Sequence, residues 1–218
     1  MGIKQSNGKK QKLTYLSKIP NFWKNYQISH LKVQEQFDSG DIVLFKSKHK
    51  LAVAYRKLVC SEFDHVAICY KQNEELQVYE VVQKGVQMFQ WDQLKLQEWY
   101  KHFEKICIRK LNYNKKNDYR VRFSNFLEEN LGNEYNLSVG KIFTFTSKIK
   151  KPNNGEKVEQ KRSFFCSELV AKAYKVIGLL DQGKSCTQYY PKDFSQEKEL
   201  ELLQGATLSP EYLVVFEE

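Results

Sequence analysis

The chain has 218 residues, of which 41% are hydrophobic and 14% aromatic, enough to bury the core of one domain of ordinary size. A mean hydropathy of −0.62 and the absence of a long apolar run exclude a membrane-spanning helix. The formal net charge is +9, but residues 1–34 hold seven lysines and no acid, so the positive charge belongs mainly to an N-terminal tail.

The tail, taken as residues 1–35, carries two signals typical of membrane attachment. Residues 1–6 match the N-myristoylation pattern, in which Gly2 is acylated after removal of the methionine. A basic patch is the second signal that one acyl chain needs for stable anchoring, and it is supplied by Lys4, Lys9, Lys10 and Lys12. We therefore expect a cytoplasmic protein held on the anionic, cytoplasmic face of a membrane. A solvated lysine tail is the alternative.

Nucleic acid is not expected as a partner, because no recognition motif accompanies the lysines.

Residues 36–218 have the pattern of a single α+β domain. Runs of hydrophobic residues between turn residues predict strands at 42–45, 65–70, 76–82, 85–89, 105–109 and 212–216. Apolar residues at helical spacing predict helices at 50–60, 118–131 and 164–177, the last two ending at Gly132 and Gly178. Residues 91–100 form a short helix or loop, and residues 148–162 a polar surface excursion. The hydrophobic residues at 22–31 could lie on a membrane or pack on the domain, and packing is the favoured interpretation.

The cysteines argue against a metal site and against a disulfide scaffold. All five are widely spaced without a CxxC pair, and the four histidines are scattered, so zinc-ligand spacing is absent. An odd number of cysteines in a chain of this length predicts a reducing, intracellular compartment. At least one thiol is then available for chemistry, and we expect neither a metal nor a cofactor.

Cys166 is the candidate nucleophile. It lies in the first turn of the predicted helix and shares a buried face with Leu169, Val170, Ala173 and Ile177. A helix N-terminus lowers the pKa of a thiol and offers backbone N–H groups to an oxyanion. The alternative is a buried cysteine of the core.

His65 and Glu80 are the candidate base and its orienting carboxylate. If residues 71–74 form the loop between the two strands, Tyr70 faces Glu75 and His65 lies directly opposite Glu80 on one face. A register slip of one residue would separate them. The other histidines (His30, His49 and His102) lie in polar segments that we expect to be exposed. The tripeptide at residues 60–62 repeats that at 166–168, but no long apolar helix follows it.

These residues resemble the NlpC-type branch of papain-like enzymes. The Gly-Asp strand at residues 40–45, the His-Val-Ala-Ile strand at 65–68 and the third polar residue, Glu80, follow its signature. Here the cysteine helix comes last, which is similar to the circularly permuted YiiX-like and YaeF-like group, related to lecithin:retinol acyltransferase-like enzymes. Residues 131–135 and 190–194 match that group as well. Asp64 replaces its common serine, and residues 148–162 look like an insertion.

The resemblance implies a permuted papain-like fold, an antiparallel sheet packed against helices with the cysteine at a helix N-terminus. It also implies hydrolysis of an amide or peptide bond through Cys166, His65 and Glu80, with an acyl-enzyme intermediate. Tyr135 is a candidate for lining the site or stabilising the oxyanion. Two alternatives stay open: a lipid deacylase or acyltransferase acting at a membrane, and an inactive interaction domain of the same fold.

Overall fold

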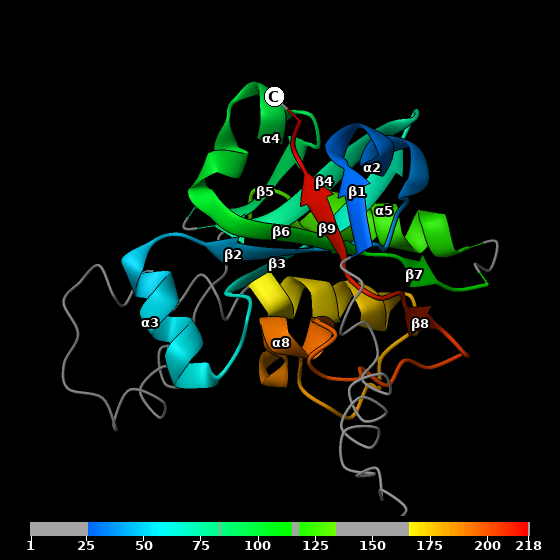
Figure 1. The fold of residues 1–218 in the computed structure, drawn as a ribbon. Helices are drawn as coiled ribbons and strands as arrows, with labels where there is room; N and C mark the ends of the chain where they lie inside the picture. Colours follow the sequence, from blue (N-terminus) through cyan, green and yellow to red (C-terminus); the bar gives the residue numbers. More distant parts are fainter. Residues whose placement is uncertain (1–25, 83, 115–117, 134–165, 218) are drawn as a thin grey trace, which may run out of the picture.

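The computed structural model describes residues 26–82, 84–114, 118–133 and 166–217, and these residues form a seven-stranded sheet with helices on both faces and a small two-stranded sheet (Figure 1). The order of the seven strands is β1-β9-β6-β2-β3-β4-β5. Only β1 and β9 pair in parallel; the other neighbours are antiparallel. The strands are β1 (Tyr26–Ser29), β2 (Ile42–Ser47), β3 (His65–Gln72), β4 (Glu75–Val82), β5 (Gly85–Gln90), β6 (Phe103–Arg109) and β9 (Tyr212–Val215).

The helices are α2 (His30–Gln36), α3 (Lys50–Val59), α4 (Gln93–Leu96), α5 (Tyr119–Asn130), α8 (Pro191–Phe194) and a helix over residues 166–176. Three of them, α3, α5 and the one over residues 166–176, lie where apolar spacing predicted them, and α4 falls in the segment predicted as a short helix or loop; α2 and α8 were not predicted. Short 3-10 helices lie at η1 (Trp99–His102) and η2 (Cys186–Gln188), and β7 (Leu111–Asn112) pairs with β8 (Thr207–Leu208). The predicted α+β class and the expected strands are therefore confirmed. In the part of the chain that the structure describes, no helix is long and apolar enough to cross a membrane.

The sheet buries a separate hydrophobic cluster on each face. Alternate residues of β2 divide between them: Ile42 and Leu44 belong to one cluster, Val43 and Phe45 to the other. The first cluster packs against α5 and the helix over residues 166–176, which runs below the sheet in Figure 1 (yellow). The second packs against α2 and α4 above the sheet. The helix over residues 166–176 is thus a central element of the core.

Residues 26–35, which the sequence analysis placed in the tail, are packed on the domain. β1 pairs with β9, and Ile28 and Val33 lie in the second core cluster. For residues 26–31 this agrees with the favoured packing of the hydrophobic segment at 22–31, whose first four residues lie outside the described part, although Leu31 remains 61% exposed. The described residues of this segment therefore contact the domain.

The turn between β3 and β4 differs from the prediction. It is a two-residue turn at Asn73 and Glu74, both with positive φ, and Gln72 pairs with Glu75. Tyr70 consequently faces Gln77 instead of Glu75. The predicted register was wrong by two residues, which leaves every side chain on its predicted face because the side-chain period of a strand is two.

The Gly-Asp motif before β2 has a structural role. The buried carboxylate of Asp41 accepts hydrogen bonds from the backbone N–H groups of Leu111 (2.6 Å) and Asp38 (2.8 Å). The hydroxyl of Tyr174, on the helix over residues 166–176, donates to the carbonyl of Gly40 (2.8 Å). These bonds fasten the start of β2 to β7 and to the central helix.

We expect Gly40→Ala to destabilise the domain. Gly40 has φ +91°, and a Cβ there would lie 2.4 Å from the Tyr119 hydroxyl and 2.8 Å from Leu111 Cδ2. Backbone strain costs about 1–2 kcal/mol, and overpacking adds about 1–3 kcal/mol. Urea unfolding measures the loss. Gly205→Ala is the matched control, because its φ is +69° but nothing lies within 4 Å of the new Cβ. Equal losses in the two variants would contradict the steric argument.

Candidate active site

His65 and Glu80 meet at one end of the sheet. Nε2 of His65, the first residue of β3, donates to Oε2 of Glu80 on β4 over 2.6 Å. The side chains are 13% and 22% exposed, so the bond is largely shielded from water. Continuing the observed register would place His65 opposite Val82, so Glu80 reaches it as a diagonal neighbour. The predicted contact exists, but through a geometry different from the predicted one.

Cys166 is the second partner of the His65 ring. Its thiol is fully buried in the first core cluster, and it interacts with the imidazole through a hydrogen bond and through charge. Because Nε2 is engaged with Glu80, Nδ1 is the ring nitrogen left for the thiol. The helical segment that carries Cys166 is buried on almost every side, as the predicted apolar face at Leu169, Val170 and Ala173 requires. Residues before 166, and therefore the start of this helix, lie outside the described part of the chain.

The two partners change the acidity of His65. Burial makes the largest single contribution to its pKa and lowers it, because the charged ring loses hydration. The charge and hydrogen bond of Cys166, followed by those of Glu80, outweigh burial and raise the pKa from 6.5 to about 10. Cys166 and Glu80 therefore both favour the charged form of the His65 ring.

The other cysteines have environments that suppress thiol chemistry or leave the thiol in water. Burial raises the pKa of Cys69 well above its usual value and that of Cys107 to about 12. Burial also raises the pKa of the half-buried Cys186. Cys60 is exposed at the end of α3, in agreement with the view that residues 60–62 only mimic the motif.

Two of the remaining histidines are exposed as predicted, and the third is buried. His49 and His102 are exposed as expected, but His30 is only 7% exposed. Its ring stacks on Phe216 at 5.3 Å, and its carbonyl accepts a hydrogen bond from the indole of Trp91 (2.9 Å). The expectation that His30 is exposed was wrong. Its neighbours in sequence are polar, but the partner that buries its ring is Phe216, which is distant in sequence.

Comparison with known proteins identifies the family. The sequence pattern of the family described as "Permuted papain-like amidase enzyme, YaeF/YiiX, C92 family" matches residues 36–211. The chain belongs to this permuted papain-like amidase family. The membership supports a hydrolase of the amide-cleaving kind and confirms the resemblance seen in the sequence.

The search of solved structures gave a weaker likeness. The crystal structure of metalloprotein yiiX from Escherichia coli O157:H7 is 22% identical, with a TM-score of 0.42, and the match covers 64% of this chain and 66% of that chain. No curated protein matched the chain. Within the described residues, no group of three or more histidine, cysteine, aspartate or glutamate side chains is arranged to hold a metal ion.

The two further motifs that were matched to this group from the sequence, residues 131–135 and 190–194, lie close to these elements where the structure describes them. Residues 132 and 133 bond to the edge of β5, since Gly132 N–H donates to the Val86 carbonyl (2.9 Å) and Val86 N–H to that of Asn133 (3.3 Å). In the other motif, Asp193 accepts from the N–H of Tyr190 (2.7 Å) at the start of α8. The neighbouring Tyr189 carbonyl accepts from the hydroxyl of Ser167 (2.6 Å). The second motif thus supports the helix beside Cys166.

Several predicted residues of this amidase lie outside the described residues. They are Tyr135, the acylation site Gly2, the tail residues Lys4, Lys9, Lys10 and Lys12, and the polar segment 148–162. Sequence reasoning also missed a feature inside the described part: Arg56 and Ser47 bond to the buried carboxylate of Asp64, directly before His65. The sequence did contain a sign of this cluster, because Asp64 stands where the similar group commonly has a serine.

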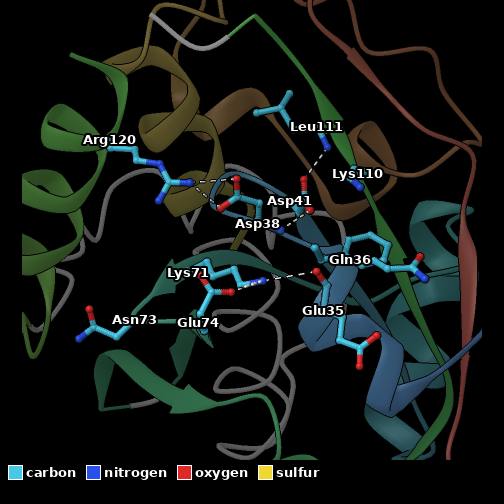
Figure 2. Close-up of a pocket in the computed structure, with 11 residues that line it drawn as sticks. Glu35, Gln36, Asp38, Asp41, Lys71, Asn73, Glu74, Lys110, Leu111 and Arg120 are labelled. Atoms are coloured by element: carbon cyan, nitrogen blue, oxygen red, sulfur yellow. Dashed lines mark hydrogen bonds and ion pairs between the residues drawn. The ribbon is translucent and has the colours of Figure 1, made fainter. Parts of the chain in front are cut away.

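A polar hollow of about 360 Å³ lies at the opposite end of β2 and β3 from His65 (Figure 2). Arg120 contacts the carboxylate of Asp38 at 3.2 and 3.3 Å, and Lys71 donates to the carbonyl of Gln34 at 2.9 Å. Lys71 also lies 3.6 Å from the Glu74 carboxylate. These pairs link the segment of α2 and Asp38 to the β3–β4 hairpin and to α5, so Arg120, Asp38, Lys71 and Glu74 make contacts within the fold.

We expect His65 to titrate near pH 10, because both of its partners favour the charged ring. A group whose pKa is raised on folding stabilises the fold fully below its unfolded pKa, near 6.5. This stabilisation is lost as the pH rises through the folded value of about 10. Glu80→Gln should lower the folded pKa. Imidazole NMR shifts followed against pH measure it, with Glu75→Gln, at the far exposed end of β4, as the control. A ring that titrates near pH 6.5 in the native protein would contradict this account.

Proposed function

We propose that the chain is a cysteine amidase or peptidase in which Cys166 is the nucleophile, His65 the base and acid, and Glu80 the group that orients His65. The observation that carries the proposal is the position of one imidazole between a buried thiol and a carboxylate. A structural histidine of the core needs no such pair of partners. Family membership supports the same class of reaction.

In the first step His65 takes the proton of Cys166, which gives a thiolate–imidazolium pair; this role is supported because Cys166 and Glu80 both favour the charged ring. The thiolate attacks the amide carbonyl carbon, and a tetrahedral intermediate forms. The imidazolium then protonates the leaving nitrogen as the C–N bond breaks, which leaves a thioester on Cys166. His65, now neutral, takes a proton from water, and the resulting hydroxide attacks the thioester. Release of the acid regenerates the pair, with the proton back on the imidazolium.

Glu80 has a separate task in this mechanism. Its carboxylate accepts a hydrogen bond from the Nε2–H group and so fixes the orientation of the ring, with Nδ1 directed to the sulfur. It also stabilises the positive charge that the ring carries during the first step. We assign the oxyanion to backbone N–H groups near Cys166, with Tyr135 as a further donor.

The N-terminal tail supports a second proposal, attachment of the enzyme to a membrane. Acylation of Gly2 would supply the apolar anchor, and four lysines would bind anionic headgroups. A lipid substrate is then the alternative to a peptide. The two are separated by whether turnover requires a lipid surface.

We expect iodoacetamide to alkylate Cys166 faster than Cys69 and Cys107 in the same folded molecule near neutral pH. These thiols are almost equally buried, so differences in reactivity report the effect of His65 rather than exposure. His65→Ala should slow Cys166 by about 100-fold or more, whereas His102→Ala should leave the rate unchanged. Peptide mapping by mass spectrometry gives each rate. Equal slow labelling of all three thiols would favour an inactive interaction domain.

Intact-mass analysis of the protein made in a eukaryotic host tests the membrane proposal. We expect loss of Met1 and gain of one myristoyl group; Gly2→Ala should abolish the myristoyl group, while Met1 is still removed because alanine is also small. Replacing the four tail lysines by glutamine should weaken binding to vesicles that contain phosphatidylserine, since each lysine contributes about 1 kcal/mol near such a surface. An unmodified or acetylated N-terminus would end the acylation hypothesis.

A further inference from the structure

Asp64 lies directly before His65, and its carboxylate is buried where three elements meet. Oδ1 accepts the backbone N–H of Ser47 (2.9 Å), at the end of β2, and Oδ2 accepts the Ser47 hydroxyl (2.6 Å). Arg56, on α3, donates to Oδ1 through Nη1. The Asp64 and Arg56 side chains are each only 7% exposed. We refer to Asp64, Arg56 and Ser47 as the Asp64 cluster.

Arg56 connects this cluster to more of the fold. The same Nη1 donates to the carbonyl of Ser47 (2.8 Å), and Nη2 donates to Glu104 on β6 (3.3 Å). Glu104 also pairs with Lys46 at 3.0 Å. A planar guanidinium can serve several acceptors at once in fixed directions. The end of β2, the start of β3, α3 and β6 are therefore held in one arrangement.

The backbone of Asp64 is fixed as firmly as its side chain. Its N–H donates to the carbonyl of Phe45 (3.1 Å), the β2 residue that pairs with His65. The rings of Phe45 and His65 lie 5.6 Å apart. The residue before His65 is thus anchored through its N–H and through both carboxylate oxygens. These bonds fix the backbone at the start of β3 and so set the direction in which the His65 side chain points.

His65 needs this accuracy because its ring serves two partners at once. Nε2 bonds to Glu80, and the same ring interacts with Cys166. Productive geometry in a site of this kind tolerates displacements of only about 0.5 Å. A small rotation of the first residue of β3 would improve one contact and break the other.

We propose that Asp64, held by Arg56 and Ser47, is a positioning residue that keeps the His65 ring aligned with Cys166 and Glu80 together. This inference rests on the proposed function, since it concerns the same site. Asp64 acts through the backbone of its neighbour and touches no reacting atom. The charge of Asp64 is balanced by Arg56, so the effect is one of geometry.

The test is Asp64→Asn, which keeps the shape of the side chain but removes its charge and one acceptor. We expect alkylation of Cys166 to slow about tenfold or more in the folded protein. Asp41→Asn is the matched control, because Asp41 is also a buried carboxylate with two backbone donors but lies at the opposite end of β2. It should lower thermal stability and leave the alkylation rate of the folded protein unchanged.

A double-mutant comparison separates positioning from general loosening of the fold. In a His65→Ala background, Asp64→Asn should change the rate less than twofold, because the ring that it positions is gone. An equal tenfold loss in that background would overturn the proposal. If Asp64→Asn does not fold, Ser47→Ala, which removes a single hydroxyl, should slow alkylation a few-fold, and Ser47→Thr should restore it. A Ser47→Ala rate equal to that of the native protein would likewise count against the proposal.

A second readout does not depend on enzymatic activity. The Nε2 proton shared by His65 and Glu80 should give a downfield NMR resonance that Asp64→Asn shifts or broadens and Asp41→Asn leaves in place. If native Cys166 alkylates no faster than Cys69, the proposed function fails while this resonance still tests the positioning. An unchanged resonance in Asp64→Asn would refute the positioning, whatever the reactivity of Cys166.

Discussion

A two-residue turn determines which side chains of β3 and β4 can meet. Asn73 and Glu74 both adopt positive φ, and the ladder that follows places the side chains of His65 and Glu80 on the same face of the sheet. An insertion of one residue would turn one of the two side chains to the other face. The hydrogen bond between the two residues, the raised pKa of His65 and the proposed chemistry of Cys166 all depend on this parity.

The parity also explains how much of the site could be predicted. The sequence pattern identified the faces of β3, β4 and the helix over residues 166–176, because apolar spacing reports burial directly. The predicted loop was too long, but the resulting register error of two residues leaves His65 and Glu80 on the same face of the sheet. Whether Glu80 lies opposite or diagonal to His65 depends on the turn, and turn geometry is weakly encoded in a polar run such as residues 71–74.

Contacts between segments that are distant in sequence could not be predicted from apolar spacing. His30 has polar neighbours in sequence but stacks on Phe216, and β1 pairs in parallel with β9. The Asp64 cluster depends on Arg56, whose long side chain has no preferred direction until α3 packs on β2. Propensity and spacing describe one element at a time, so they place a residue on a face without naming its partner. β2 is therefore fastened at each end by a buried carboxylate, Asp41 and Asp64, whose partners are visible only in the fold.

The order of the elements along the chain has a consequence for biosynthesis. β3 and β4 can pair early, because a tight turn joins them, but Cys166 and the helix that carries it are synthesised about a hundred residues after His65. β1 must wait still longer for β9. Pairings of such long sequence separation form slowly. On the ribosome, His65 and Glu80 would thus be joined in the hairpin before Cys166 is made, and the thiol would meet its base only after about a hundred further residues.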